Sequence, residues 1–215
     1  TEGADATFRP VTDPARLAAA RGRHGIAAED RVLTYVGGFN RHKNVIRLIE
    51  AMPAILAACP AARLVIVGRT TGDRFWDNVD ELRAGASRDA RASGRITFPG
   101  EITDADMAEL LSLSDALVFP SLWEGFGLPA VEAMYCATPV LASDRGSLPE
   151  VVGGAGLMFD PERSGELAGA AVRLLTEPGL RDHLARAALE RAARFTWEAS
   201  AELTERAFLR TLSRA

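Results

Sequence analysis

The stretch "RVLTYVGGFNRHKNVIRLIEA" (residues 31–51) places an apolar run, a glycine loop and an amphipathic segment in immediate succession. Residues 31–37 are rich in β-branched and apolar side chains and show no polar face, which is typical of a strand covered on both sides. The segment after the loop has one apolar stripe at helical spacing, made by Val45, Leu48, Ile49, Met52, Ile55 and Leu56. This order predicts a strand that leads through a loop into a covering helix.

Short apolar runs of the same kind recur at residues 62–68, 94–100, 115–121, 139–143 and 156–160. Helices are expected between them, among them one over residues 73–91 and one that starts near Thr103. Pro53 predicts a kink or a broken turn in the first helix, and Gly85 an interruption in the second. Strand and helix in repeated alternation predict an α/β protein with a Rossmann-like, doubly wound parallel sheet and helices on both faces. Ligands of such sheets bind at the carboxyl ends of the strands.

Composition narrows the class of protein. A formal net charge of -4 argues against a nucleic-acid-binding surface. Cys59 and Cys136 lie in apolar, helix-like segments, which indicates packing residues in a reducing compartment and predicts a cytoplasmic protein. No apolar run approaches the roughly 18 residues of a membrane-spanning helix, and the N-terminus has no signal-peptide profile.

The loop after the first strand holds Lys43, the only lysine among 25 basic side chains. One interpretation is a chance survivor on a solvated loop. The other is that a compact ammonium is needed next to a phosphate, where a planar guanidinium fits less well. Gly37 and Gly38 permit close approach of the backbone to a ligand, and Arg41 and Lys43 can flank one anionic group such as a diphosphate. His42 between them is interpreted as an exposed loop residue.

The loop after the fourth strand, "FPSLWEGFGLPAVEAM" (residues 119–134), combines glycines with two carboxylates. Gly125 and Gly127 open a turn into a helix with Pro129 in its first turn, and exposed backbone N–H groups at such a helix start bind anions. Glu124 and Glu132 are predicted to face one crevice, where ionised carboxylates accept hydrogen bonds from sugar hydroxyls. For Glu132 alone, the alternative is an acid placed near a helix start by the helix dipole.

Two other motifs favour different chemistry. "GFGLPA" satisfies the dinucleotide-binding pattern, with Asp144 as a candidate ribose ligand, although it follows the fourth strand rather than the first. "DAD" at residues 104–106 resembles the metal-binding motif of metal-dependent glycosyltransferases. Thr103 and Asp106 have the spacing of a capping box, so a helix cap is expected there instead of a metal site.

Taken together, "YVGGFNRHKNVIRLIEA", "LVIVG", "FPGEITDADMAELLSLSDALVFPSLWEGFGLPAVEAM", "TPVLASDRGSLPEVVGGAGLMFDP" and "RFTWEASA" resemble the C-terminal half of the family 4 retaining GT-B glycosyltransferases. The resemblance runs in order from about residue 1 to 205. It implies one half of a GT-B fold and a sugar-transfer enzyme that retains anomeric configuration, with no metal or other cofactor. "PSLWEGFGLP" and "SLPEVVGGAG" resemble the mannosyltransferase-like branch, so GDP-mannose is the favoured donor, with UDP-sugars open.

The resemblance also implies roles for individual residues. Arg41 and Lys43 match the cations that hold the donor diphosphate, Glu124 the acid next to the transferred sugar, and Glu132 the acid that binds the ribose. The remaining donor contacts match the glycine turn, the base-reading loop and the loop before the helix, namely Gly37, Gly38, Gly100, Ile102, Thr103, Gly125, Phe126, Gly127 and Leu128.

The implied organisation has three parts: an interdomain segment at 1–14, a donor-binding domain at 15–195, and a helix at 196–215 that would cross to an N-terminal acceptor domain. Because that domain is not in this chain, the terminal helix is expected to dock weakly, and the chain is expected to bind donor without turnover. The full-length enzyme would bind membranes peripherally if its acceptor is a lipid. The open alternatives are an NAD-dependent oxidoreductase that uses "GFGLPA", and a non-catalytic sugar-nucleotide-binding module.

Overall fold

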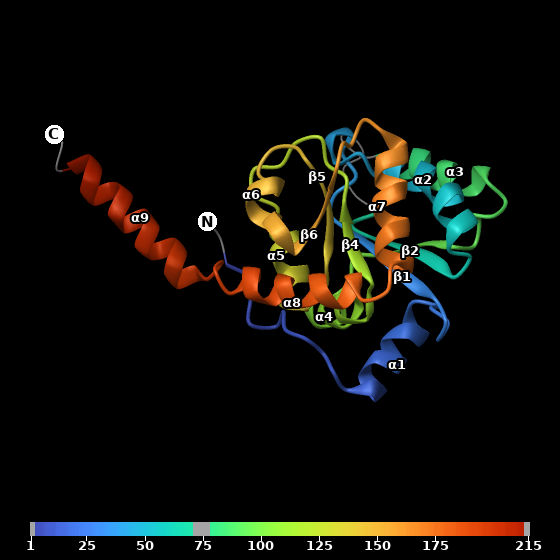
Figure 1. Cartoon of the computed structure of the whole chain (residues 1–215), viewed down its shortest axis with the longest axis horizontal. Coiled ribbons are helices and arrows are strands. Elements are labelled where there is room, and N and C mark those ends of the chain that lie inside the picture. The colour runs from blue at the N-terminus through green and yellow to red at the C-terminus, as the bar shows by residue number, and fades with distance from the viewer. Residues whose placement is uncertain (1–2, 71–77, 213–215) are drawn as a thin grey trace.

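The computed structural model describes residues 3–70 and 78–212, and its centre is a six-stranded parallel sheet (Figure 1). The strand order is β3-β2-β1-β4-β5-β6, and all neighbouring strands pair in parallel. The strands are β1 (Arg31–Val36), β2 (Ala62–Val67), β3 (Ile96–Gly100), β4 (Ala116–Phe119), β5 (Val140–Ser143) and β6 (Gly156–Phe159). The predicted doubly wound sheet is therefore confirmed, and each predicted strand lies within two residues of its expected limits.

Helices cover both faces of the sheet. One layer packs α2 between α3 and α7; the other contains α4, α5, α6 and α8, with α1 beside α4 (Figure 1). The bounds of the helices are α1 (Pro14–Arg23), α2 (Val45–Ala58), α3 (Val79–Arg88), α4 (Asp104–Leu113), α5 (Leu128–Tyr135), α6 (Leu148–Val152), α7 (Ser164–Thr176), α8 (Leu180–Ala192) and α9 (Trp197–Leu212), with short 3-10 turns η1 (Arg41–Lys43) and η3 (Gly153–Ala155).

The prediction of a broken turn at Pro53 is wrong, because α2 remains helical across it. A proline inside a helix costs about 3 kcal/mol. Leu48, Met52 and Ile55 are fully buried on the two sides of Pro53, and burying each such side chain contributes roughly 1.5–3 kcal/mol. The buried stripe therefore outweighs the local penalty and keeps α2 continuous.

Gly85 does not interrupt α3, which corrects the second helix prediction. A Cβ atom at Gly85 would lie 2.9 Å from Cδ1 of Ile46, so the glycine lets α3 approach α2 closely. Residues 73–77 of the predicted helix lie outside the described residues.

The terminal helix α9 begins as predicted and leads away from the body of the molecule (Figure 1). Thr196 Oγ1 accepts a hydrogen bond from the Ala199 N–H at 3.1 Å, which caps the first turn. Large apolar side chains along the helix are exposed, namely Leu203, Phe208, Leu209 and Leu212. This exposure agrees with the expectation that α9 docks weakly within this chain.

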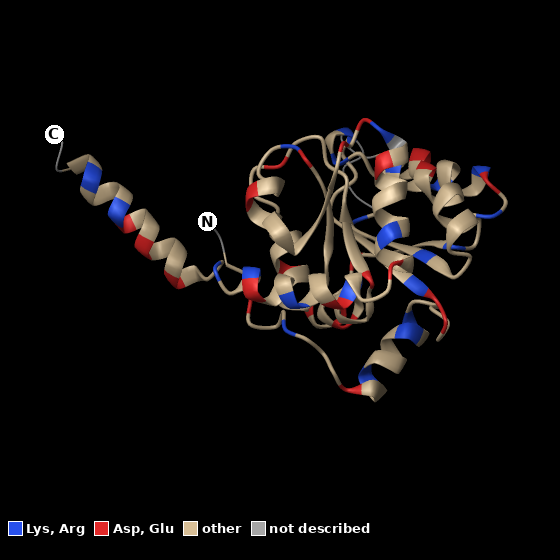
Figure 2. Cartoon of the chain, viewed as in Figure 1, with Lys and Arg blue, Asp and Glu red and all other residues tan. Residues whose placement is uncertain are grey.

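Charged and sulfur-containing side chains also follow the sequence interpretation. Figure 2 shows basic and acidic residues interspersed over helices and loops, in keeping with the small net charge of -4. Cys59 and Cys136 are both buried as free thiols, as expected of packing residues.

Candidate functional site

The sheet has its topological switch point between β1 and β4, since the chain winds outward in opposite directions from these two neighbouring strands. Loops that leave such a pair at their carboxyl ends diverge and form a crevice, the usual ligand site of this architecture. The two loops are joined by a backbone hydrogen bond, in which the Leu122 N–H donates to the His42 carbonyl at 2.7 Å. The sequence-predicted loops around Lys43 and Glu124 are therefore the two at the switch point.

Lys43 and Glu124 form an ion pair between these loops. Lys43 Nζ donates to Glu124 Oε1 at 2.7 Å, and the side chains are only 20% and 11% exposed. Lys43 Nζ also lies 5.9 Å from the centroid of the Phe119 ring. A cation and an anion are thus held together, partly shielded from water, beside the carboxyl ends of β1 and β4.

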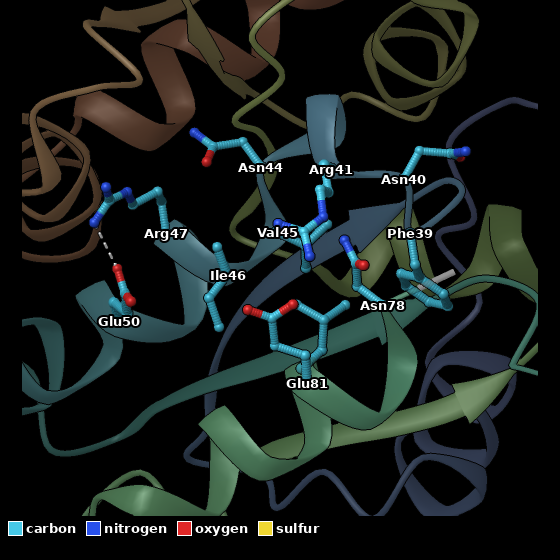
Figure 3. Close-up of a pocket in the computed structure, with 11 residues that line it drawn as sticks. Phe39, Asn40, Arg41, Asn44, Val45, Ile46, Arg47, Glu50, Asn78 and Glu81 are labelled. Atoms are coloured by element: carbon cyan, nitrogen blue, oxygen red, sulfur yellow. Dashed lines mark hydrogen bonds and ion pairs between the residues drawn. The ribbon is translucent and has the colours of Figure 1, made fainter. Parts of the chain in front are cut away.

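Arg41 takes a different direction from Lys43. Figure 3 shows its side chain extending toward Asn78 in a pocket of about 280 Å³ between the starts of α2 and α3, which Glu81 also lines. Lys43 and Glu124 do not line this pocket. Among the described residues, the Arg41 guanidinium has no ion-pair partner. The side chains of the two predicted cations therefore do not converge on one position, although η1 carries both residues.

Glycines form the backbone at the carboxyl ends of β1, β2 and β3. Gly37 and Gly100 have φ angles of 152° and 86°, a region that favours glycine. At Gly68, a Cβ atom would lie 2.1 Å from the Gly37 carbonyl oxygen, so no larger residue fits without moving the loop. The sequence interpretation selected Gly37 and Gly100 but not Gly68, whose constraint comes from a loop distant in sequence.

Tyr35 fixes the turn at Gly38. Its hydroxyl donates to the Gly38 carbonyl at 2.6 Å, while Gly38 itself is exposed. Burial, and secondarily the charge of Glu124, raises the pKa of the Tyr35 phenol. The hydroxyl consequently stays protonated and remains a donor.

The loop before α5 is shaped by Gly127, which adopts a φ angle of 98° at the N-cap. A Cβ atom there would lie 2.9 Å from Leu148. Gly125 is exposed with open space around it, and Leu128 starts the helix half-buried. The half-buried Phe126 packs edge-on against Phe195, with ring centroids 5.8 Å apart.

Ser147 supports this loop from the segment after β5, a contribution that the sequence interpretation missed. Its hydroxyl donates to the carbonyls of Phe126 at 2.8 Å and Glu124 at 3.2 Å. Gly146 lies equally close, since a Cβ atom there would be 2.8 Å from the Glu124 carbonyl oxygen. The backbone of Glu124 is thus held by residues that follow a different strand.

Glu132 lies half-buried on α5. Burial, reinforced by the charge of Asp104, raises its pKa to about 7. Its carboxyl group has no hydrogen bond or ion pair to any described residue. Glu132 is therefore available to a ligand, and the influence of Asp104 links it to the loop after β3.

That loop ends in the predicted helix cap. Thr103 Oγ1 accepts from the Asp106 N–H at 3.2 Å and donates to the Asp106 carboxylate at 3.0 Å, while Ile102 is half-buried. The capping prediction for the "DAD" segment is confirmed. Within the described ranges, no group of three or more His, Cys, Asp or Glu side chains is arranged to hold a metal ion. In the same ranges, no helix has the length and hydropathy to cross a membrane.

Comparisons with known proteins bear on the family and the fold of this chain. A family model described as "Glycosyl transferases group 1" matches residues 18–191. The chain is 34% identical over 164 residues to the O-antigen chain mannosyltransferase B of Escherichia coli. The matched region covers 76% of this chain and 42% of that relative. It spans less than half the length of this curated relative.

Two solved structures share the fold. Sucrose-phosphate synthase from Thermosynechococcus elongatus has a TM-score of 0.82 at 31% identity, covering 100% of this chain and 52% of the other. The Anabaena protein HepE in complex with UDP-glucose has a TM-score of 0.82 at 26% identity, covering 99% of this chain and 56% of the other. The likeness to these GT-B glycosyltransferases confirms the predicted fold class.

Proposed function

The chain belongs to the family of glycosyl transferases group 1, and on that premise we propose that it is the donor-binding half of a retaining hexosyltransferase that uses a nucleotide-sugar. The observation that carries the proposal is the Lys43–Glu124 pair at the switch point between β1 and β4. A cation there meets the donor diphosphate, and a carboxylate beside it meets the hydroxyls of the transferred sugar.

The proposed donor site follows the carboxyl edge of the sheet. Lys43 binds the diphosphate from the loop after β1, and Arg41 adds a second positive charge at its outer side. Glu132 binds the ribose hydroxyls from α5, where its carboxyl group has no hydrogen bond or ion pair to another described residue. Backbone groups from Gly100 to Thr103 contact the base, and Gly37, Gly38 and the segment Gly125–Leu128 approach the phosphates and the sugar.

In this proposal the protein acts mainly through fixed charge. Bond cleavage at the anomeric carbon leaves negative charge on the departing nucleoside diphosphate, and a preorganised ammonium at Lys43 stabilises it. Glu124, freed from Lys43 by the incoming phosphate, accepts hydrogen bonds from the sugar and fixes its orientation. We propose retention of configuration and no metal requirement, with Arg41 and Lys43 supplying the positive charge.

We further propose a mannosyl donor carried by GDP. The mannosyltransferase among the relatives supports mannose, whereas the UDP-glucose bound by HepE supports a UDP-sugar. The acceptor would be bound by a further domain of the whole protein, so the proposal is that this chain alone binds donor without transfer.

The test is a thermal-shift series of this chain with GDP, GDP-mannose, UDP, UDP-glucose and NAD, with Lys43→Ala and Glu132→Ala alongside. A ligand at about 100 times its Kd stabilises a fold by roughly 2.7 kcal/mol, a shift of several degrees for a domain of this size. We expect a shift with one nucleotide series that both substitutions abolish. A shift with NAD alone would contradict the proposal and favour the oxidoreductase alternative.

A further inference from the structure

Asn44 follows Lys43 at the start of α2, and both its burial and its backbone conformation are unusual for an asparagine at a helix N-cap. It is buried, with 8% exposure, and its backbone is left-handed, with φ 55° and ψ 28°. An asparagine at a helix N-cap ordinarily accepts a hydrogen bond from the first turn through its side chain. Here the Asn44 side chain makes no such capping bond. Its burial therefore has another cause.

The side-chain amide of Asn44 joins three loops at the carboxyl edge of the sheet. Nδ2 donates to the carbonyl of Pro120 at 3.1 Å and to the carbonyl of Pro161 at 3.0 Å. Pro120 follows β4, and Pro161 follows β6. Both hydrogens of one buried NH₂ group are used, and each acceptor belongs to a different loop.

We propose that Asn44 is a positioning residue that sets Lys43 against Glu124. Lys43 is its immediate neighbour, and Pro120 lies on the loop that leads to Glu124, so the bond at Pro120 fixes the spacing of the two loops. The bond at Pro161 prevents the loop after β1 from moving sideways. The Asn44 side chain bonds neither the Lys43 ammonium nor the Glu124 carboxylate. It acts by fixing the loops that carry these two groups. The functional meaning of this role rests on the proposed donor site, while the geometry itself does not.

The residue type fits this role. Only glycine, asparagine and aspartate adopt the left-handed region readily, and of these only asparagine can donate two hydrogen bonds. Asn44→Gly keeps the backbone conformation and removes both donors. Asn44→Asp keeps the shape but directs a carboxylate at two carbonyl oxygens, so it should disturb the loops more.

The experiment is a double-mutant cycle on unfolding by urea, which needs no ligand. The coupling between Lys43 and Glu124 is obtained from Lys43→Ala, Glu124→Ala and the double variant, first with Asn44 intact and then with Asn44→Gly added to each. With Asn44 intact we expect a coupling of at least about threefold in the unfolding equilibrium constant, as for a well-placed ion pair. With Asn44→Gly the coupling should disappear.

A general loss of stability would not produce this result. Thr34→Val is the matched control, since Thr34 in β1 makes a buried hydrogen bond to Ser114, at the end of α4, at 2.7 Å. It should lower stability and leave the Lys43–Glu124 coupling unchanged. Equal coupling before and after Asn44→Gly, or no coupling while Asn44 is intact, would overturn the proposal.

Measurements of nucleotide binding distinguish a failure of the positioning role of Asn44 from a failure of the proposed function. If the chain binds GDP or UDP, Asn44→Gly should raise Kd about tenfold in the otherwise unchanged protein and less than about twofold in the Lys43→Ala background. Equal losses in both backgrounds would overturn the positioning role. If neither nucleotide binds, the donor-site proposal fails, and the coupling measurement still decides whether Asn44 positions the pair.

Discussion

The ammonium of Lys43 lies 2.7 Å from Oε1 of Glu124, across 81 positions of sequence, and joins the loops that follow β1 and β4, the two strands at which the strand order reverses. This contact has a direct consequence for the proposed binding of a donor. A diphosphate that approaches Lys43 competes with Glu124 for the same ammonium, and it also meets the negative charge of that carboxylate. In the proposed donor site, Glu124 would therefore oppose the nucleotide part of a donor and, once released, support the sugar part.

Glu124→Gln should separate these two effects. We expect a nucleoside diphosphate to bind a few-fold more tightly, because the competing charge is gone. The additional affinity of the nucleotide-sugar over the nucleoside diphosphate should fall, because a neutral amide is a weaker acceptor for sugar hydroxyls than a carboxylate. Isothermal titration of GDP and GDP-mannose, or of UDP and UDP-glucose, measures both. Glu190→Gln, an exposed change on α8, should alter neither value; weaker binding of the diphosphate to Glu124→Gln would contradict the competition.

Lys43 and Arg41 in η1 and Arg47 in α2 should differ in their contribution to diphosphate binding. Lys43→Ala should raise the Kd for a nucleoside diphosphate at least about tenfold, as expected for loss of a charge-assisted hydrogen bond. Arg41→Ala should have a smaller effect, because the Arg41 side chain extends toward the pocket beside α3. Arg47→Ala is the control, since Arg47 is paired with Glu50 at 2.9 Å on the surface of α2. A larger loss for Arg41→Ala than for Lys43→Ala would reverse this order.

Much of the fold could be predicted from the sequence because its signals are local. Runs such as residues 62–68 are mostly apolar, and each becomes a strand of the sheet. The errors arose where packing overrides a local signal. Pro53 is held in α2 by the buried stripe around it, and Gly85 permits contact with Ile46. Neither outcome can be deduced without knowing what lies opposite.

In the candidate site, too, some features follow from local sequence and others depend on packing. Its loops could be predicted, because glycines, prolines and charges after apolar runs mark the carboxyl ends of strands. The contact between Lys43 and Glu124, and the support from Ser147 and Asn44, depend on which loops become neighbours in space. Arg41 and Lys43 lie two positions apart, yet the turn between them sends their side chains to different surroundings. Their roles toward a donor stay predictions.

Glu132 should make stability depend on pH. Its pKa is about 7 in the folded chain, above the value of 4.5 for a free glutamate, because of burial and then Asp104. Between these two values the folded state holds a proton that the unfolded state has lost, so the contribution of Glu132 to stability falls as pH rises and is constant above about pH 7. Urea unfolding at pH 5 and pH 8 should show that Glu132→Gln loses less stability over this interval than the unchanged chain.

Asp104→Asn tests the cause of that pH dependence. Removing the charge of Asp104 should reduce the effect only in part, since burial is the larger contribution to the raised pKa. Identical pH dependence in the unchanged chain and in Glu132→Gln would show that Glu132 does not titrate in this interval.

Gly68 should tolerate no side chain, because a Cβ atom there would lie 2.1 Å from the Gly37 carbonyl oxygen and 2.8 Å from the Phe39 ring. Gly68→Ala must displace the loop after β1, so we expect about 1–3 kcal/mol loss of stability, as for overpacking, together with weaker nucleotide binding.

Gly169→Ala is the matched control, since Gly169 lies exposed in α7 with nothing within 4 Å of an added Cβ atom. That change should stabilise the chain by about 0.5–1 kcal/mol, because alanine is the better helix former, and should leave binding unchanged. Urea unfolding and isothermal titration of both variants give the comparison. If Gly68→Ala kept the stability and the nucleotide affinity of the unchanged chain, the loop would have room to move, and the close approach of Gly68 to Gly37 would not constrain the site.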